Sequence, residues 1–164
     1  MKTMEELIIE ASTSSAPSDF DFFFGDWIVR NRKLKKRLEN CDEWLEFEAA
    51  SHCRPVLRGH GNTDSITTGD FEGYTLRLFD PVTRLWSIYW ADSNHVRLDV
   101  PQIGSFDGDI GTFLARDTFN GIPIIVRFDW NRADREHPVW SQAFSADGGQ
   151  SWEWNWFMEF ERRK

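Results

Sequence analysis

The segment FDFFFGDWIVRNRKLKKR, residues 20–37, combines an aromatic cluster, the motif Gly25-Asp26-Trp27 and a long β-branched and basic run. The run has the composition of a first β-strand. From Trp27 onward, apolar and polar residues form short strand-like stretches separated by turn residues about every ten positions, and no 3.6-residue period is visible. Every recognisable connection has the length of a hairpin turn. We therefore expect an all-β fold, a single antiparallel up-and-down β-barrel of about eight to ten strands.

Gly25-x-Trp27 at the start of a first strand resembles the opening of the lipocalin and fatty-acid-binding-protein (calycin) barrels. The longer pattern FDFxxGxW also resembles the opening of a bacterial protein family of unknown function, over about residue 19 to the end. The calycin resemblance implies a lipocalin-like barrel in which Trp27 closes one end. It also implies that an arginine of the last strand packs near Trp27, and here that strand ends Phe160-Glu161-Arg162-Arg163.

The length and composition predict one domain. A chain of 164 residues can bury about two-thirds of its unfolded surface in a single core. Residues 1–18 contain the run STSSAPS, whose small apolar surface does not offset its ordering entropy. We therefore expect a flexible N-terminal tail over 1–18, or a loosely docked helix at Met4 to Ala11, and a barrel domain over 19–164.

Charge and hydropathy limit the partners and the location. The formal net charge of -8 disfavours binding to nucleic acid, which needs a cationic face. The chain has no apolar run long enough for a membrane span and no signal-peptide core, so we predict no membrane partner and a cytoplasmic location. Cys41 and Cys53 are then expected to be free thiols.

The first hairpin is predicted to turn through two residues, Asn40-Cys41. This turn would place Lys35 opposite Glu46 on the neighbouring strand. It would also place Lys33 opposite Glu48. Cross-strand pairs of opposite charge stabilise a sheet by about 0.2 to 1 kcal/mol each, so this face is predicted to be exposed to solvent.

The same alternation creates a conflict at Trp27, because Trp27 shares the parity of Lys33 and would then also face solvent. A β-bulge adds one residue and changes the face that later side chains occupy. We therefore expect Trp27 to be buried and a bulge to lie between Ile28 and Arg32.

Two later hairpins have stronger turn patterns. Phe119-Asn120-Gly121-Ile122 predicts a type I′ turn, which places Gly111 opposite Trp130 and Leu114 opposite Arg127. Residues 145–152, SADGGQSW, match the Asp-box pattern of sialidase propellers, but a propeller needs about four or more blades and one copy is present. This motif therefore predicts a rigid hairpin only. The last strand is expected to place one apolar row on one face, formed by Trp152, Trp154, Trp156, Met158 and Phe160.

The sequence contains no recognisable catalytic or metal-binding motif. The four histidines are spread singly and the two cysteines are not paired, so we predict no metal site and no cofactor. His60, Asn62 and Asp64 share one strand face beside glycines. They either line a pocket or belong to an ordinary solvated strand.

The fold leads to the main functional hypothesis, because an antiparallel barrel of this size encloses space that side chains or a small ligand occupy. We expect an uncharacterised small-molecule-binding barrel for a partly apolar ligand, with or without an anionic group. One alternative is an enzyme with His60 and Asp64 as acid and base. Another is a barrel filled by its tryptophans that acts through a homodimer interface. The candidate ligand-binding residues are His60, Arg77, Trp90, Arg127, Trp140 and Asn155.

Overall fold

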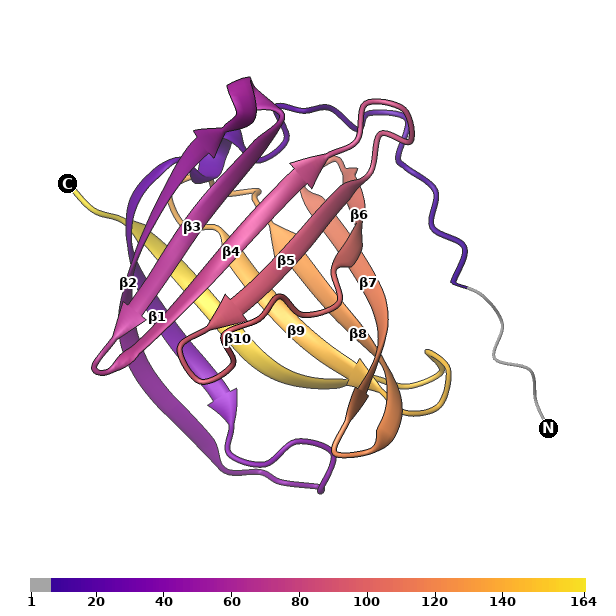
Figure 1. Cartoon of the computed structure of the whole chain (residues 1–164). Helices are drawn as coiled ribbons and strands as arrows, with labels where there is room; N and C mark the ends of the chain where they lie inside the picture. The colour runs from indigo at the N-terminus through magenta and orange to yellow at the C-terminus, as the bar shows by residue number, and fades with distance from the viewer. Residues whose placement is uncertain (1–6) are drawn as a thin grey trace.

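The computed structural model describes residues 7–164 and contains ten strands in one closed antiparallel barrel (Figure 1). Each strand pairs with its neighbours in sequence, and β10 pairs with β1 to close the sheet. The predicted all-β, up-and-down barrel is therefore confirmed. The strands are β1 (Gly25–Leu34), β2 (Trp44–Val56), β3 (Gly61–Thr68), β4 (Phe71–Phe79), β5 (Trp86–Asp92), β6 (Gln102–Asp107), β7 (Ile110–Phe119), β8 (Ile122–Asn131), β9 (Val139–Ser145) and β10 (Glu153–Arg162).

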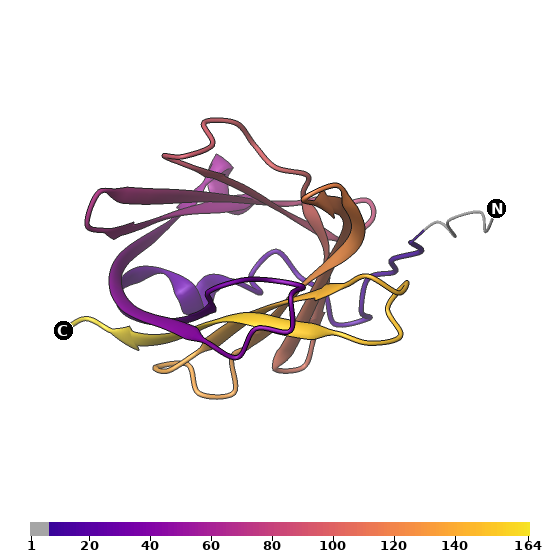
Figure 2. The same cartoon turned by 90° about the horizontal axis from the view of Figure 1, so that it is seen from below.

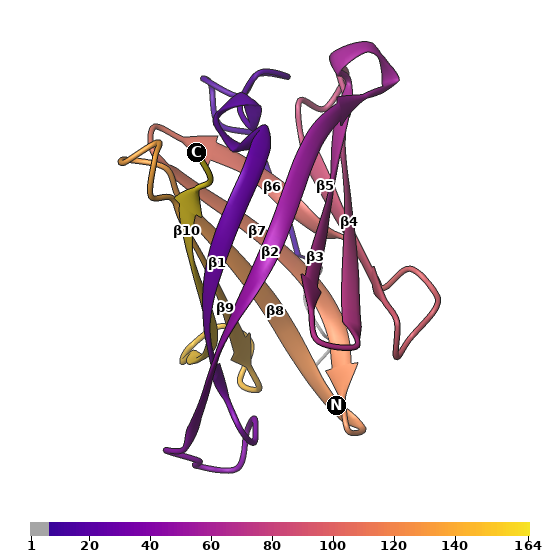
Figure 3. The ribbon, with the colours of Figure 1, turned by 90° about the vertical axis from the view of Figure 1, so that its left-hand side faces the viewer.

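The two ends of the barrel differ. The short 3₁₀ helix η1 (Asp21–Phe23) covers one end, which also carries the second 3₁₀ helix, η2 (Leu57–Gly59). The opposite end, called the mouth here, is formed by the connections 35–43, 69–70, 93–101, 120–121 and 146–152. Figure 3 shows η1 above the barrel and the 35–43 connection below it, and Figure 2 looks into the mouth. No helix within residues 7–164 is long and apolar enough to cross a membrane.

Trp27 lies at the closed end and is fully buried, as predicted. Its indole Nε1 donates a hydrogen bond to the carbonyl oxygen of Phe23 at 2.8 Å, which joins the first strand to η1. The guanidinium of Arg162 in β10 lies 4.2 Å from the centroid of the Trp27 ring. The arginine contact implied by the calycin resemblance is therefore present.

Aromatic rings fill the closed end. Phe20 packs against Trp86 and Phe106, with ring centroids 4.9 and 5.1 Å apart. Phe23 packs against Trp130 at 4.9 Å. Each such ring can bury about 150 to 250 Å², so this cluster supplies much of the apolar burial of a small domain. The segment 20–27 therefore acts as a plug that the barrel strands surround.

The predicted register of the first hairpin is wrong. The connection spans residues 35–43, and Lys33 lies opposite Leu45 while Arg32 lies opposite Glu46. This register differs by an odd number of residues from the predicted one, so it exchanges the two faces. Trp27 and Lys33 both face the interior on an unbroken β1, and the expected bulge is absent.

The other hairpin predictions agree better with the structure. In the β7–β8 hairpin, Gly111 lies opposite Trp130 and Leu114 opposite Arg127, as predicted. Asn120 and its following glycine both have positive φ, as a type I′ turn requires. The Asp-box segment forms a tight turn held by Asp147, which accepts a hydrogen bond from the backbone N–H of Ser151 at 2.9 Å. Hydrogen bonds, chiefly those from Ser151, lower the pKa of Asp147 to about 2.

The bulge of this barrel lies in β10 instead of β1. The β9–β10 register shifts between Trp154 and Trp156, so Asn155 turns inward. The predicted apolar row is therefore split. Trp156, Met158 and Phe160 share the parity that faces the interior, while Trp154 stacks with Phe157 on the outer face. Asn155 is buried at this shift, and its side-chain oxygen accepts a hydrogen bond from Gln142 Nε2 at 2.9 Å.

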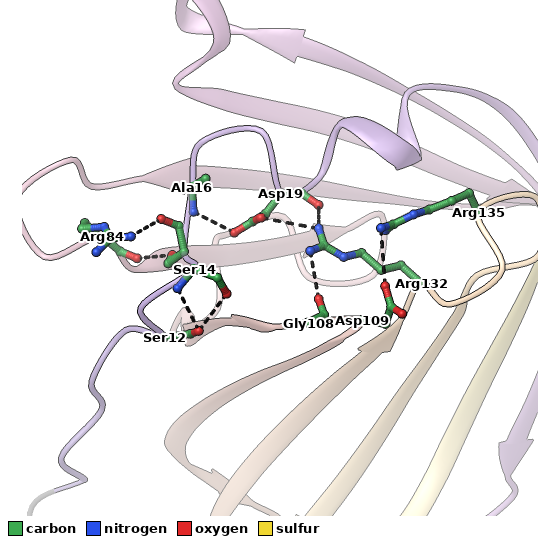
Figure 4. Close-up of polar contacts among 10 residues, drawn as sticks. Ser12, Ser14, Ala16, Asp19, Arg84, Gly108, Asp109, Arg132 and Arg135 are labelled. Carbon is green, nitrogen blue, oxygen red and sulfur yellow. Dashed lines mark hydrogen bonds and ion pairs between the residues drawn. The ribbon is translucent and has the colours of Figure 1, made fainter.

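Residues 12–19 pack along the barrel instead of leaving it (Figure 4). Ser15 is buried, and its hydroxyl donates to the carbonyl oxygen of Arg84 at 2.6 Å. The Arg84 guanidinium donates in return to the carbonyl oxygen of Ser15. Arg132 bonds to Asp19, also buried. The composition of residues 1–18 predicted a flexible tail, and it did not reveal these arginine partners. Residues 7–11 have no regular secondary structure, and part of the expected helix at Met4 to Ala11 lies outside the described residues.

Candidate functional site

A cavity of about 940 Å³ occupies the barrel between the aromatic plug and the mouth. Pockets for small ligands are typically about 300 to 1,000 Å³, so this volume suits a molecule of that class. Its middle is mainly apolar, and polar side chains gather at its two ends. The apolar wall includes Ile66, Ile88, Ile124, Val126, Phe128, Trp140, Phe144 and Met158.

A buried ion pair lies at the floor, next to the plug. Arg77 in β4 pairs with Asp64 in β3, and both side chains are less than a tenth exposed. Arg77 also donates to the amide oxygen of Asn62 at 2.9 Å, and its guanidinium lies 5.0 Å from the Phe20 ring centroid. Because Asp64 already balances the charge of Arg77, the floor is close to electrically neutral.

Three buried side-chain atoms at the floor have no hydrogen-bond partner among the described residues: Arg77 Nε, the hydroxyl oxygen of Ser51, and Asp64 Oδ2, whose contact with Arg77 is the ion pair. All three residues line the cavity. Nearby Cys53 is also buried, and burial raises the pKa of its thiol to about 12. The thiol therefore stays protonated at neutral pH.

The mouth has a basic side built by β1, the 35–43 connection and β10. The Lys33 Nζ lies 4.1 Å from the centroid of the Trp156 ring, and Arg37 lies over the rings of Phe119 and Phe144. Trp156 is held in place by its Nε1, which donates to Asn31 Oδ1 at 2.9 Å. Both cationic side chains line the cavity.

The charge state of the basic side follows from its burial. Burial, and then the positive charge of Arg37, lower the pKa of Lys33 to about 8, against the attraction of Asp92. Burial also lowers the pKa of Arg37, against the attraction of Glu153. Within the described residues, neither Lys33 nor Arg37 forms an ion pair with a carboxylate. The basic side of the mouth therefore holds two basic side chains, and Asp92 and Glu153 act on them without forming ion pairs.

Carboxylates face the mouth from β5, β7 and the 93–101 connection. Burial raises the pKa of Asp99, and the nearby charges of Asp117 and Asp92 raise it further. Burial favours a higher pKa for Asp92 as well, but hydrogen bonds from Trp90 Nε1 and from two backbone N–H groups give a net lowering. Within residues 7–164 no group of three or more His, Cys, Asp or Glu side chains is arranged to hold a metal ion.

The wall is incomplete beside these carboxylates. β5 and β6 pair over only three positions, residues 86–88 with 102–104. Beyond them, the 93–101 connection replaces regular strand pairing. Its backbone bonds to β5 at two places, through the Asp99 N–H to the carbonyl oxygen of Trp90 and through an isolated bridge between Asp92 and His95. The mouth is therefore bordered here by an exposed connection instead of a continuous sheet.

Three of the six sequence-predicted residues line the cavity, namely Arg77, Trp90 and Trp140. Asn155 is buried nearby and contacts the cavity-lining Gln142.

The other two residues lie elsewhere. Arg127 is on the outer face, where it pairs with Asp129 at 2.9 Å and lies over the rings of Trp152 and Trp154. His60 is exposed beside η2, whereas Asp64, its proposed partner in acid–base chemistry, faces inward and pairs with Arg77. The structure therefore does not bring the His60 and Asp64 pair into one site.

Sequence reasoning missed Lys33 and Arg37. The expected two-residue turn placed Lys33 in solvent. The alternation along one strand could have shown its true position, because Lys33 lies on the same face as Trp27, Val29 and Asn31.

No protein-family model matches the chain, and no curated protein is significantly similar to it. The closed ten-strand antiparallel barrel is consistent with a lipocalin-like fold.

Proposed function

We propose that this barrel binds a small, partly apolar molecule inside its cavity. The observation that carries the proposal is the cavity of about 940 Å³, which has apolar rings around its middle and polar groups at its two ends. A barrel that only needed stability would gain from filling this space, because protein interiors are close-packed and cavities cost stability. The retained space therefore supports a binding role.

We further propose that the ligand carries an anionic group and that basic side chains at the mouth bind this group. Arg37 remains protonated at neutral pH and has no ion-pair partner among the described residues, while Arg77 is neutralised by Asp64. Lys33 adds positive charge whenever it is protonated. An arginine that binds a carboxylate contributes charge-assisted hydrogen bonds, which are about twice as strong as neutral ones.

Binding of dansyl-labelled undecanoic acid tests this proposal. We expect the probe to quench tryptophan emission, because Trp90, Trp140 and Trp156 line the cavity. Arg37→Gln should weaken binding by about 1.5 to 3 kcal/mol, the range for a hydrogen bond to a charged group. The matched control is Arg127→Ala, which removes an arginine from the outer face and should leave the affinity unchanged. Absence of quenching in the wild-type chain would contradict the proposal.

We also propose that the chain belongs to the calycin barrels and to the bacterial family whose members open with FDFxxGxW. This membership is supported by the fully buried Trp27, by the Arg162 guanidinium over its ring and by the position of the plug at the start of β1. A cytoplasmic location also stays a prediction from the sequence. The acid–base alternative gains no support, since His60 is exposed outside the cavity.

A homodimer is a second candidate, and outer-face aromatic rings support it. Phe157 contacts Trp44 and Trp154, with centroids 5.9 and 6.4 Å apart, and a hollow of about 540 Å³ lies beside them across β1, β2 and β10. Partly exposed rings that gather on one face are typical of protein interfaces. Sedimentation velocity should then show a dimer that Trp44→Ala weakens. A monomer at all concentrations would contradict this candidate.

A further inference from the structure

Lys33 differs from the other lysines that the structure describes. Lys35, Lys36 and Lys164 are exposed, and Lys35 is paired with Glu43 at 3.2 Å. Lys33 instead points into the cavity, where its Nζ lies over Trp156 and near Arg37. A primary amine therefore lies at the mouth end of a chamber whose middle is mainly apolar, without a carboxylate ion-pair partner among the described residues.

This environment favours the neutral, nucleophilic form of the amine. Lysine is activated as a nucleophile when it is desolvated or placed beside another cation, and burial and the neighbouring Arg37 act on Lys33 in these two ways. The charged groups that act on it are Arg37 from the 35–43 connection and Asp92 from β5. With a pKa of about 8 instead of 10.5, Lys33 has about 300 times more neutral amine at pH 7 than an ordinary lysine.

We propose that Lys33 condenses reversibly with the carbonyl group of an apolar aldehyde bound in the cavity. The inference rests on the proposed binding function and specifies one chemical class of ligand. The large rings and aliphatic side chains around the middle of the cavity suit the apolar body of such a molecule, and β1 places the amine at the mouth end of that chamber.

The reaction needs no further reactant. Nζ attacks the carbonyl carbon and forms a C–N bond, which gives a carbinolamine. The former carbonyl oxygen then leaves as water, with both of its hydrogens derived from the amine, directly or by exchange with solvent. An imine of Lys33 remains. When protonated, the imine keeps the positive charge of the lysine, so the contact with the Trp156 ring and the attraction of Asp92 persist.

Reductive trapping tests the proposal on the full chain. The protein is incubated with 2-naphthaldehyde and sodium cyanoborohydride at pH 7, and the modified residues are mapped by peptide mass spectrometry. We expect Lys33 to be labelled at least about tenfold faster than Lys35 or Lys36, since its larger neutral fraction outweighs its lower intrinsic basicity. The advantage should shrink as the pH rises from about 8 to 10.5, because the exposed lysines then lose their protons too. Peptide mapping separates these labels from any on the terminal amine.

Two controls make the outcome decisive. Lys33→Arg keeps the charge but cannot form an imine, so its label should disappear, whereas Lys35→Arg should leave the label on Lys33 unchanged. In the wild-type chain, 2-naphthalenemethanol has the same apolar body without the carbonyl group and should slow labelling of Lys33 by competition. This second control does not depend on the folding of a variant.

Three results would overturn the inference. Lys33 could be labelled no faster than Lys35, the Lys33→Arg variant could still be labelled rapidly at another residue, or the alcohol could fail to slow labelling of Lys33. Quenching of tryptophan emission by the alcohol or by the dansyl fatty acid is measured in parallel. If either ligand binds and Lys33 is not selectively labelled, the aldehyde inference fails and the proposed binding function stands. If neither binds, the proposed function itself fails.

Discussion

The guanidinium of Arg162 lies 4.2 Å from the ring centroid of Trp27, so a residue near the end of β10 covers a residue near the start of β1. The same guanidinium donates hydrogen bonds to the carbonyl oxygens of Phe22 and Phe24, each at 2.8 Å. These carbonyls belong to η1 and the residue that follows it. Arg162 therefore ties the plug to the seam at which the sheet closes.

Replacing Arg162 with alanine is expected to destabilise the fold by about 1.5 to 3 kcal/mol, because hydrogen bonds to a charged group are lost and two partly buried carbonyls lose their donor. Urea unfolding followed by tryptophan emission measures this change. Arg163→Ala is the matched control, because Arg163 is exposed and surface substitutions usually change stability by less than about 0.5 kcal/mol. Equal stability of the two variants would show that Arg162 does not hold the plug.

The Arg77 and Asp64 pair leads to a second prediction. Removing one partner leaves an uncompensated buried charge, so Asp64→Asn should cost about 3 to 5 kcal/mol. Replacing both residues with apolar ones of similar size should recover much of that loss. The control is Glu161→Gln, which breaks the exposed pair with Arg30 and should cost less than about 1 kcal/mol. Similar losses in the two single variants would contradict the buried-pair interpretation.

The two cysteines are expected to differ in reactivity. Burial raises the pKa of the Cys53 thiol to about 12, and its side chain is almost fully enclosed, so little thiolate forms at pH 8. Cys41 is partly exposed in the 35–43 connection. Iodoacetamide at pH 8 should therefore modify Cys41 in the native protein and reach Cys53 only after unfolding in urea. Peptide mass spectrometry checks this, and rapid native labelling of Cys53 would contradict the enclosed position.

The pairing register of two strands was predicted correctly where the turn between them requires particular residues. Asn120-Gly121 demands positive φ at both positions, and this fixed the whole β7–β8 hairpin. The 35–43 connection carries no comparable requirement, since its positive φ values fall on Leu38 and Asn40. Charge pairing alone therefore suggested the wrong register there, and the face of Lys33 was predicted wrongly with it.

The candidate site was harder to predict than the fold for the same physical reason. Faces alternate every residue in a strand, so one bulge or one odd shift reassigns every later side chain. Asn155 shows this in β10, where the register shift places its amide inward and Trp154 on the outer face. Arg77 was chosen as a polar residue within an expected strand, and the alternation of β4 does bury its side chain.

The stability of the fold is expected to depend on pH through Lys33. Its pKa is lowered to about 8 by burial first and by Arg37 second, so the folded state binds fewer protons there than the unfolded state between about pH 8 and 10.5. The contribution of Lys33 to the free energy of unfolding therefore rises with pH across that window, and its full destabilising effect is present below pH 8.

Lys33→Met is accordingly expected to stabilise the protein at pH 7, by about 1 kcal/mol after allowance for partial exposure and for the lost contact with Trp156. The gain should shrink as the pH approaches 10.5, because the amine is then neutral in both states. Urea unfolding of both chains at pH 7 and at pH 10 measures the change, with Lys35→Met as the exposed control that should show no gain. A stabilising substitution that also abolishes selective labelling by the aldehyde would mark Lys33 as a residue kept for binding at a cost in stability. A loss of stability at pH 7 would instead show that the cationic form of Lys33 supports the fold.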